Sequence, residues 1–505
     1  MNVLLVSCKK LDWMQESKGA IPLPLLYLAS VLKSKGHEPI ILDLSVKARY
    51  TENYNNMDAL RDIDAAIQQH DPSLIGFNCF VSQQFPFIMQ AAEHIKTYTD
   101  IHITLGGAHP SLFPVEILEH CPAIDTVVIG EGETQIIDII NSIEKNNVHV
   151  LSSTQALAWR SDSKVIKNDR VGFIKDLDSI PMPSWDLINL EDYYGDHTGW
   201  HNPKGFDIKV SIPILTSRSC PFSCNFCACF TTMGRMFRVR SPYKVVDEIE
   251  YLNKEFGMNY FGFIDDIVNI RKDHIIGICN EIIRRKLDIQ FEPTCGLYLG
   301  KVDDDIAKAM ARAGCTFARL PVEHGSDWIR TNVIGKKISR ESIFKAQKVL
   351  KANGIRTSTM SIMGFPEDTV ETLQETYDLL IELNADLNYV FNLIPMPGSR
   401  VFEQAVNEGL LNVNFDINSL WRGDVELDPV QKDQQFYIKP KDMTFEEMAM
   451  FRQKFNQIRI LSDEIKEEIS KSNETNKPSH SSLINDLANG VESQVESGMI
   501  LQAGR

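Results

Sequence analysis

Short apolar runs alternate with helical patterns along most of this chain, and that alternation constrains the fold more than any other feature. Five such βα units follow one another in the first 147 residues. Parallel strands need crossover helices between them, so consecutive βα units favour one parallel sheet with helices on both faces. The sequence therefore predicts an α/β fold that begins with a doubly wound parallel sheet. Its expected strands are 3–6, 39–42, 74–77, 101–105 and 126–129.

The alternation resumes with longer periods from about residue 209. Six further apolar runs are separated by helical patterns, whereas a closed (β/α) barrel needs eight units. The sequence therefore predicts a partial (β/α)6 barrel over residues 209–400. Its expected strands are 210–215, 259–264, 288–293, 316–321, 356–362 and 387–393.

Three other segments lack the regular alternation of strands and helices. Residues 148–208 hold a candidate hairpin and the proline-rich stretch Ile180–Trp185, which predicts a linker between the domain at 1–147 and the barrel. Residues 401–470 are expected to form a mainly helical C-terminal cap. Residues 471–505 are rich in Ser, Asn, Glu and Gly and poor in aromatic residues, so we expect a disordered tail.

The charge balance limits the partners of the chain. Lys and Arg number 52 against 68 Asp and Glu, for a net charge of -16. Because phosphate contacts need concentrated cations, no nucleic-acid partner is expected. The short basic stretches at 235–240 and 284–286 are interpreted as solvated surface. The N-terminus lacks the pattern of a signal peptide, and the longest apolar run, 21–32, is too short for a membrane span. We therefore expect a cytoplasmic location.

Cysteines form one compact group in the loop after the first barrel strand. Cys220, Cys224 and Cys227 lie within eight residues. Soft thiolates select zinc, copper(I) or iron–sulfur clusters, and structural zinc usually takes a second, distant pair of ligands that is missing here. Three thiolates leave one iron of a 4Fe–4S cluster open to a substrate. A zinc knuckle or a chance cluster of cysteines is the alternative interpretation. Cys229 is interpreted as a bystander, and the six scattered cysteines as small buried apolar residues.

The spacing C-x-x-x-C-x-aromatic-C, with Phe226 at the aromatic position, resembles the signature of the radical S-adenosylmethionine (SAM) superfamily. The resemblance implies a 4Fe–4S cluster on the three cysteines, with SAM bound to the open iron. It also implies reductive cleavage of SAM to a 5′-deoxyadenosyl radical, and hence an electron donor such as flavodoxin or ferredoxin.

Further barrel segments extend this resemblance and indicate SAM contacts. Asp265 ends the second strand, although a helix cap would explain it equally well. Glu323 ends the fourth strand in a stretch similar to the family's G-x-E-S, but Pro321 stands where the family has glycine. Gly364 and Pro366 match the fifth-strand G-x-P-x-E segment. Together with Phe226, these residues are the expected SAM site. Active sites of barrels lie at such carboxyl ends of strands.

The N-terminal half resembles the Rossmann-like cobalamin-binding domain that precedes many radical SAM cores. The matching stretches include Leu105–Ser111 and Val128–Glu133. A G-x-G-x-x-G turn after the first strand is missing, so a nicotinamide cofactor is not expected. The lower axial histidine motif D-x-H-x-x-G is also missing, and His109 is interpreted as an ordinary surface or turn residue. The resemblance implies a cobalamin slot lined by Ser82, Gly106, Gly107, Gly130, Glu131 and Gly132.

The combined resemblances predict a cobalamin-dependent methyltransferase that acts on an unactivated carbon of a small molecule or natural-product precursor. An oxidative cyclase or rearrangement enzyme is the first alternative, because the anaerobic magnesium-protoporphyrin ester cyclase has the same domain order. A non-enzymatic cobalamin or iron–sulfur binding protein is the alternative from another class. No catalytic side chain is assigned, since Tyr298, Arg319 and His324 are equally well explained as ordinary barrel residues.

Overall fold

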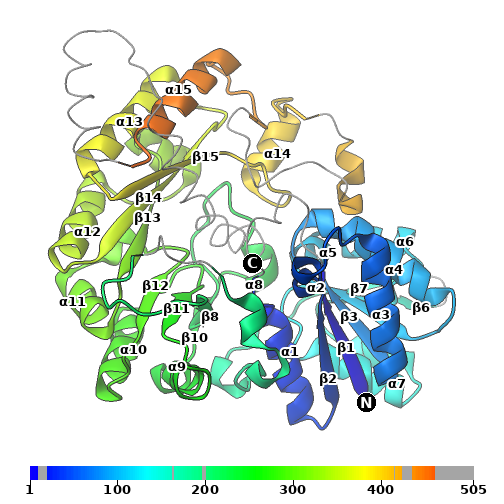
Figure 1. The fold of residues 1–505 in the computed structure, drawn as a ribbon. Coiled ribbons are helices and arrows are strands. Elements are labelled where there is room, and N and C mark those ends of the chain that lie inside the picture. Colours follow the sequence, from blue (N-terminus) through cyan, green and yellow to red (C-terminus); the bar gives the residue numbers. More distant parts are fainter. Residues whose placement is uncertain (9–19, 162–163, 196–200, 414–415, 424–434, 461–505) are drawn as a thin grey trace.

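The computed structural model describes residues 1–8, 20–161, 164–195, 201–413, 416–423 and 435–460 (Figure 1). The segment expected to be a disordered tail, 471–505, lies outside these residues. No helix among the described residues combines the length and the apolar character that a bilayer crossing requires.

The N-terminal domain is built on a seven-stranded sheet in the order β2-β1-β3-β4-β5-β6-β7. The first five strands are parallel, as predicted, with β1 central to the early βα units. They are β1 (Asn2–Ser7), β2 (Glu38–Asp43), β3 (Leu74–Asn78), β4 (His102–Gly106) and β5 (Thr126–Val128).

Helices cover both faces of this sheet, which confirms the doubly wound fold. Side chains of α1 (Leu23–Ser34) and α7 (Gln135–Glu144) share one apolar cluster with one face of the sheet. The opposite face packs on α3 (Asn56–His70), α4 (Phe85–Lys96) and α6 (Pro114–His120). The short helices α2 (Leu44–Tyr50) and α5 (Ala108–Leu112) follow β2 and β4, at the carboxyl edge of the sheet.

The sheet continues into the segment that was predicted to be a linker. The expected hairpin forms as β6 (Leu157–Ser161) and β7 (Lys164–Asn168), and β6 pairs antiparallel with β5. Leu157 and Trp159 are buried on the α1 face, while Ala158 is buried on the α3 face. Because β6 buries side chains on both faces, it belongs to the core of the first domain. Residues 148–168 are therefore part of that domain, and the connection to the barrel begins after β7.

The second domain is the predicted partial barrel. Its strands run parallel in two hydrogen-bonded groups, β8-β11-β12 and β13-β14-β15. A parallel bridge between Phe291 and Cys315 joins the groups. The strands are β8 (Ile212–Ile214), β11 (Tyr260–Phe263), β12 (Gln290–Pro293), β13 (Phe317–Glu323), β14 (Arg356–Met363) and β15 (Leu387–Asn392).

Helices with apolar inner faces enclose the barrel on its outside (Figure 1). Local signals set their ends: the Ser241 side chain caps the start of α9, and Gly257 ends it in the left-handed conformation. The Thr369 side chain likewise caps the start of α13. The enclosing helices are α9 (Pro242–Phe256), α10 (Lys272–Arg284), α11 (Asp304–Ala313), α12 (Arg340–Ala352) and α13 (Val370–Leu383).

The described residues beyond the barrel are mainly helical and reach both domains. They form α14 (Arg400–Asn407), a 3-10 segment (Ile417–Arg422) and α15 (Phe445–Gln457). Helix α15 packs on α13 and β15. The ring of Trp421 stacks on His120 of the N-terminal domain, with centroids 4.4 Å apart. This segment therefore bridges barrel and sheet on the side where α14 lies in Figure 1.

Candidate functional site

The three clustered cysteines lie on a loop between the short strand β9 (Ser217–Arg218) and α8 (Phe230–Met233). All three are partly exposed. The loop is anchored on both sides: the Asn225 amide donates to the Ile334 carbonyl (2.9 Å), and its carbonyl accepts from the Val401 amide (3.0 Å). The residues after β13 and the start of α14 thus hold the loop against the barrel.

The donor set on this loop suits an iron–sulfur cluster. Without a metal, burial raises the pKa of Cys220 to about 11 and that of Cys224 to about 12. A hydrogen bond with Cys229, whose Sγ lies 3.2 Å away, lowers the pKa of Cys227. A bound metal deprotonates such thiols, and iron–sulfur clusters take one thiolate on each ligated iron. Among the described residues, no three His, Cys, Asp or Glu side chains are close enough together to hold one metal ion. A 4Fe–4S cluster does not require this, because each of its cysteines binds a different iron.

Asp265 has the properties expected of a ligand-binding carboxylate. It lies just beyond β11 and is 1% exposed. Its Oδ1 accepts from the Thr216 amide (3.1 Å), the Thr216 hydroxyl (2.8 Å) and the Ser217 hydroxyl (2.5 Å). Its Oδ2 accepts no hydrogen bond from any described residue. The alternative interpretation as a helix cap is wrong, because α10 begins at Lys272 with Arg271 as its cap residue.

Glu323 lies beside the cysteine loop, but its carboxylate is already paired. Lys336 donates to Glu323 Oε1 (2.6 Å) and to the Pro321 carbonyl (2.9 Å). Both partners of the ion pair are buried. Burial opposes the charge of the amine, yet Glu323 and the nearby Cys224 keep the pKa of Lys336 above its usual value. The cation next to the sulfurs favours thiolates.

The remaining predicted SAM residues gather around the loop after β14. The Phe226 ring meets Phe365 edge-on, with centroids 6.3 Å apart. The Gly364 amide donates to Asp368 (2.7 Å), and the Pro366 carbonyl accepts from the Lys441 amide (2.9 Å). The cysteine loop therefore contacts the β14 loop through apolar rings, while Asp265 approaches from β11.

A cavity of about 280 Å³ lies between the carboxyl edge of the N-terminal sheet and the barrel. Two glycines at this edge have no room for a side chain. At Gly107 (φ 121°) a Cβ would lie 2.2 Å from the Cys79 carbonyl oxygen, and at Gly130 (φ 78°) it would lie 2.4 Å from that of Thr232. Residues from both domains line the cavity, among them Asn78, Gly106, Gly107, Gly130, Glu131, Gly132, Glu133, Pro213, Leu215, Arg218, Met233 and Ile264.

Five of the six predicted cobalamin contacts border this cavity, and Ser82 does not. The Ser82 hydroxyl instead lies 3.0 Å from Nδ1 of His109. His109 is 2% exposed, and its Nε2 donates to the Trp421 carbonyl (2.9 Å). Burial lowers its pKa to about 4. The interpretation of His109 as a surface histidine is therefore wrong. Its Nδ1 is occupied by the Ser82 hydroxyl, and its Nε2 is occupied by the Trp421 carbonyl of the C-terminal segment.

Sequence reasoning missed a buried charge network that joins the two domains at this cavity. Arg218, two residues before Cys220, donates to Glu131 (3.0 Å) and Glu133 (2.5 Å), which follow β5. Arg238, on β10 (Arg238–Val239), donates to Glu131 at 2.7 and 2.9 Å. The interpretation of Arg238 and Arg240 as solvated surface is wrong, since both are buried. The available signal was the pair of carboxylates in Gly130–Glu133, which closely follows the buried strand β5.

Comparisons with known proteins agree with this geometry. The B12 binding domain family matches residues 19–150, and the radical SAM superfamily matches residues 214–380. An uncharacterised methyltransferase from Pyrococcus horikoshii is 29% identical over 416 residues, which cover 82% of this chain and 84% of that protein. The anaerobic magnesium-protoporphyrin IX monomethyl ester cyclase of Cereibacter sphaeroides is 28% identical over 371 residues, covering 71% and 58%.

Two solved structures share the fold. OxsB, a cobalamin-dependent SAM radical enzyme solved with aqua-cobalamin and SAM, has a TM-score of 0.68 at 17% identity, covering 94% of this chain and 71% of that chain. TsrM from Kitasatospora setae, a radical SAM methyltransferase solved with cobalamin and a 4Fe–4S cluster, has a TM-score of 0.65 at 18% identity, covering 90% and 81%.

The chain thus combines a B12 binding domain with a radical SAM domain whose barrel carries the three clustered cysteines. The chain belongs to the radical SAM enzymes that carry an N-terminal cobalamin-binding domain. Its cofactors are a 4Fe–4S cluster, SAM and cobalamin.

Proposed function

We propose that this protein is a cobalamin-dependent radical SAM methyltransferase that methylates an unactivated carbon of a small molecule. The observation that carries the proposal is the shared cavity, which is lined by the glycine-rich edge of the cobalamin-type sheet and by residues next to the cysteine loop. When bound, the cluster supplies reductive cleavage of SAM, and cobalamin supplies methyl-transfer chemistry. Two such groups can meet one substrate only where both domains border the same space.

The side chains of the chain bind and orient these groups. Cys220, Cys224 and Cys227 would hold the cluster. Asp265 would accept a hydrogen bond from a hydroxyl or amine of SAM through its unpaired Oδ2. Glu323 is a weaker candidate for that role, because Lys336 already donates to it. The packing of α14 and the cysteine loop on the barrel limits the entry of water.

Cofactor content and the fate of the SAM methyl group test the proposal. Protein expressed without oxygen and with cobalamin supplied is expected to hold about four irons and about one cobalamin per chain. With methyl-deuterated SAM and a reductant, it should form 5′-deoxyadenosine and S-adenosylhomocysteine, and a methylated product should carry the label. About four irons with no cobalamin would overturn the methyltransferase mechanism.

An oxidative cyclase is the second candidate, because the cyclase of Cereibacter sphaeroides is 28% identical to this chain over 371 residues, against 29% over 416 residues for the methyltransferase relative. The two reactions share hydrogen abstraction and differ in the next step. A cyclase would form 5′-deoxyadenosine without S-adenosylhomocysteine, and no deuterium would enter its product. The same labelling experiment therefore separates the two candidates.

We also propose that a one-electron donor of the flavodoxin or ferredoxin type docks over the cysteine loop. Pro221 and Ser223 are exposed there. The exposed Arg235 and Arg400 donate to carbonyls of this loop. Lys337, which directly follows the buried Lys336, is a third exposed cation. In a chain of net charge -16 such cations would steer an acidic carrier to this face.

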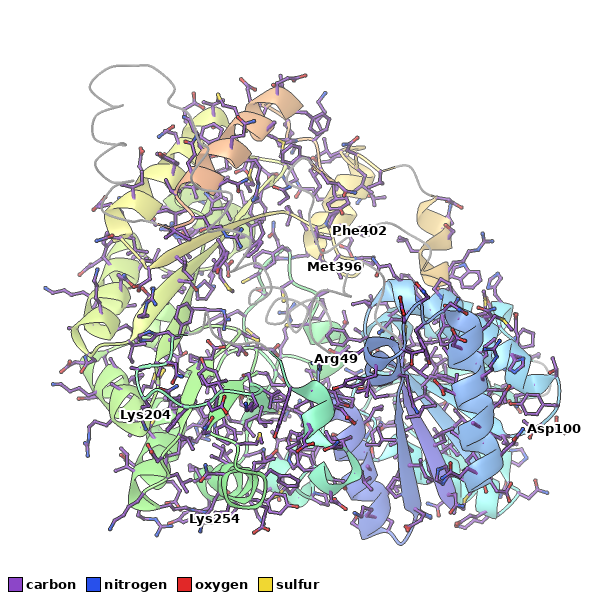
Figure 2. The ribbon with its side chains drawn as sticks, in the orientation of Figure 1. Arg49, Asp100, Lys204, Lys254, Met396 and Phe402 are labelled. Carbon is purple, nitrogen blue, oxygen red and sulfur yellow. The ribbon has the colours of Figure 1, made fainter. Side chains whose placement is uncertain are left out.

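Charge reversal tests this docking face. Arg235→Glu with Arg400→Glu is expected to slow flavodoxin-driven SAM cleavage at low salt at least tenfold more than it slows dithionite-driven cleavage. Lys254→Glu, on the remote helix α9 (Figure 2), is the control. Equal slowing of flavodoxin-driven and dithionite-driven cleavage by the two substitutions would contradict the proposal.

We also propose that the enzyme is located in the cytoplasm, because a reducing compartment preserves its ten free thiols.

A further inference from the structure

The network around Arg218 connects the loop after β5 to the loop that carries the cysteines. Arg218, Arg238, Glu131 and Glu133 are each at most 8% exposed. Arg238 also donates to the Ser219 hydroxyl (3.0 Å), and the Glu131 carboxylate accepts from the Ile174 amide (3.2 Å). Glu131 and Arg238 therefore have partners on several elements, and Arg218 donates to both glutamates.

Glu133 differs from the others, because one of its carboxylate oxygens has no donor within the described part of the chain at hydrogen-bond distance and angle, although the backbone amides of Gly132 and Glu133 also favour its charged form. Its Oε1 accepts from Arg218, whereas its Oε2 is buried and without a hydrogen-bond donor among the described residues. Burial alone would raise the pKa of Glu133, but Arg218 holds it below the usual value. The carboxylate is thus charged and can only accept. A buried, unpaired acceptor of this kind is costly unless a ligand supplies the donor.

Glu133 also lies where such a ligand would be bound. It lines the interdomain cavity together with Gly130 and Gly132, and Arg218 lines the same cavity from the barrel side. The aromatic ring of Tyr27, another lining residue, lies 5.5 Å below the Arg218 guanidinium. Glu133 is therefore held in one orientation by Arg218.

We propose that Glu133 is a corrinoid-binding residue, whose Oε2 accepts a hydrogen bond from an amide or hydroxyl donor of cobalamin, and that Arg218 positions it. This inference rests on the proposed function, since it requires that cobalamin occupies the cavity. The corrin ring carries amide donors, and the nucleotide tail carries hydroxyl donors. Either would satisfy the free oxygen.

Equilibrium binding of hydroxocobalamin, followed by its absorbance, tests the proposal on full-length protein that carries its cluster. Glu133→Gln is expected to weaken binding about tenfold, as for the loss of one charge-assisted hydrogen bond. Its iron content and thermal midpoint are compared with those of the wild type. Glu133→Asp keeps the charge opposite Arg218, so its cobalamin affinity should lie between those of the wild type and Glu133→Gln. This variant serves as the test if the glutamine variant does not fold.

Glu248→Gln is the matched control. Glu248 is fully buried and pairs with Arg240 (2.6 Å), yet it does not line the cavity. We expect its variant to bind cobalamin like the wild type. Equal weakening by both substitutions would overturn the proposal, because the effect would then be a general loss of stability. Wild-type affinity in Glu133→Gln would overturn it as well.

Cobinamide, which lacks the nucleotide tail, distinguishes the two donors. A tenfold penalty with cobalamin that vanishes with cobinamide assigns the donor to the tail, and a penalty with both assigns it to the ring amides. Failure of this inference is distinct from failure of the proposed function. In the first case the wild type binds cobalamin and Glu133→Gln matches it, whereas in the second the wild type binds none.

Discussion

The N-terminal domain borders the cavity with several glycines at the carboxyl edge of its sheet, whereas the barrel holds its clustered cysteines and the Lys336–Glu323 ion pair at and beyond the ends of its strands. Gly107 and Gly130 make room by having no side chain. Cys224, Lys336 and Arg218 act through the groups that they present. One edge therefore limits the size of what can bind, and the other fixes where reactive groups are held.

Contacts between the N-terminal domain and the rest of the chain also hold the two domains together. Arg49, at the end of α2, donates to the Asp192 carbonyl (2.7 Å) in the connection between the domains (Figure 2). Buried ion pairs such as Arg218 with Glu131 add direction to this contact, although their net contribution to stability is small. The comparison predicts that substitutions at the barrel edge abolish chemistry, whereas substitutions at the glycine edge weaken the binding of a ligand.

The largest effect is expected for the proposed cluster ligands. Cys224→Ala should lose nearly all bound iron and lower SAM cleavage by several orders of magnitude, because the remaining thiolates cannot hold the cluster. Iron and sulfide analysis of anaerobically purified protein checks this. Cys229→Ala is the control and should keep its iron. Loss of iron from Cys229→Ala would show that the fourth cysteine is a ligand.

A smaller effect is expected for the buried cation beside the cysteines. Lys336→Met leaves Glu323 as an uncompensated buried charge, which is expected to lower the free energy of unfolding by about 3–5 kcal/mol. Urea unfolding of the wild type and the variant measures it. The neighbouring Lys337 is exposed, and Lys337→Met should change stability by no more than about 0.5 kcal/mol. Similar values for both variants would contradict the assigned role of the ion pair.

At the glycine edge, Gly107→Ala should cost about 1–3 kcal/mol, because the left-handed backbone there is strained for any other residue. The new Cβ would also overlap the Cys79 carbonyl oxygen, which lies 2.2 Å from its position, so this edge must shift and cobalamin affinity should fall together with stability. Thermal unfolding and cobalamin titration measure the two effects. Gly172→Ala, where a Cβ meets no atom within 4 Å, should match the wild type in both.

The smallest effect concerns the contact between His109 and the C-terminal segment. The folded-state pKa of His109 is lowered to about 4, so the folded state holds the neutral ring. Its contribution to stability is fully present above the unfolded pKa of about 6.5 and is lost as pH falls from there toward 4. Between pH 7.5 and 5.5 the wild type should lose about 1 kcal/mol more than His109→Gln. Equal losses in urea unfolding at the two pH values would refute this.

Much of the architecture could be predicted because it depends on local patterns. The βα alternation predicted the parallel part of the first sheet and all six barrel strands, since hydrophobic periodicity and crossover rules act over a few residues. The spacing of Cys220, Cys224 and Cys227 indicated one site for the same reason. These thiols are close in sequence and therefore close in any loop that they form.

Tertiary structure alone decided the features that depend on partners far along the chain. Strand β6 is part of the sheet because helices of the first domain pack on both of its faces. Arg238 is buried because Glu131 lies opposite it and pairs with its charge. His109 is buried by Trp421, which is more than 300 residues away. Burial of a polar group depends on whether a distant partner satisfies it. The sequence by itself therefore determined the elements and the cluster motif, while packing decided which charges and strands close the cavity.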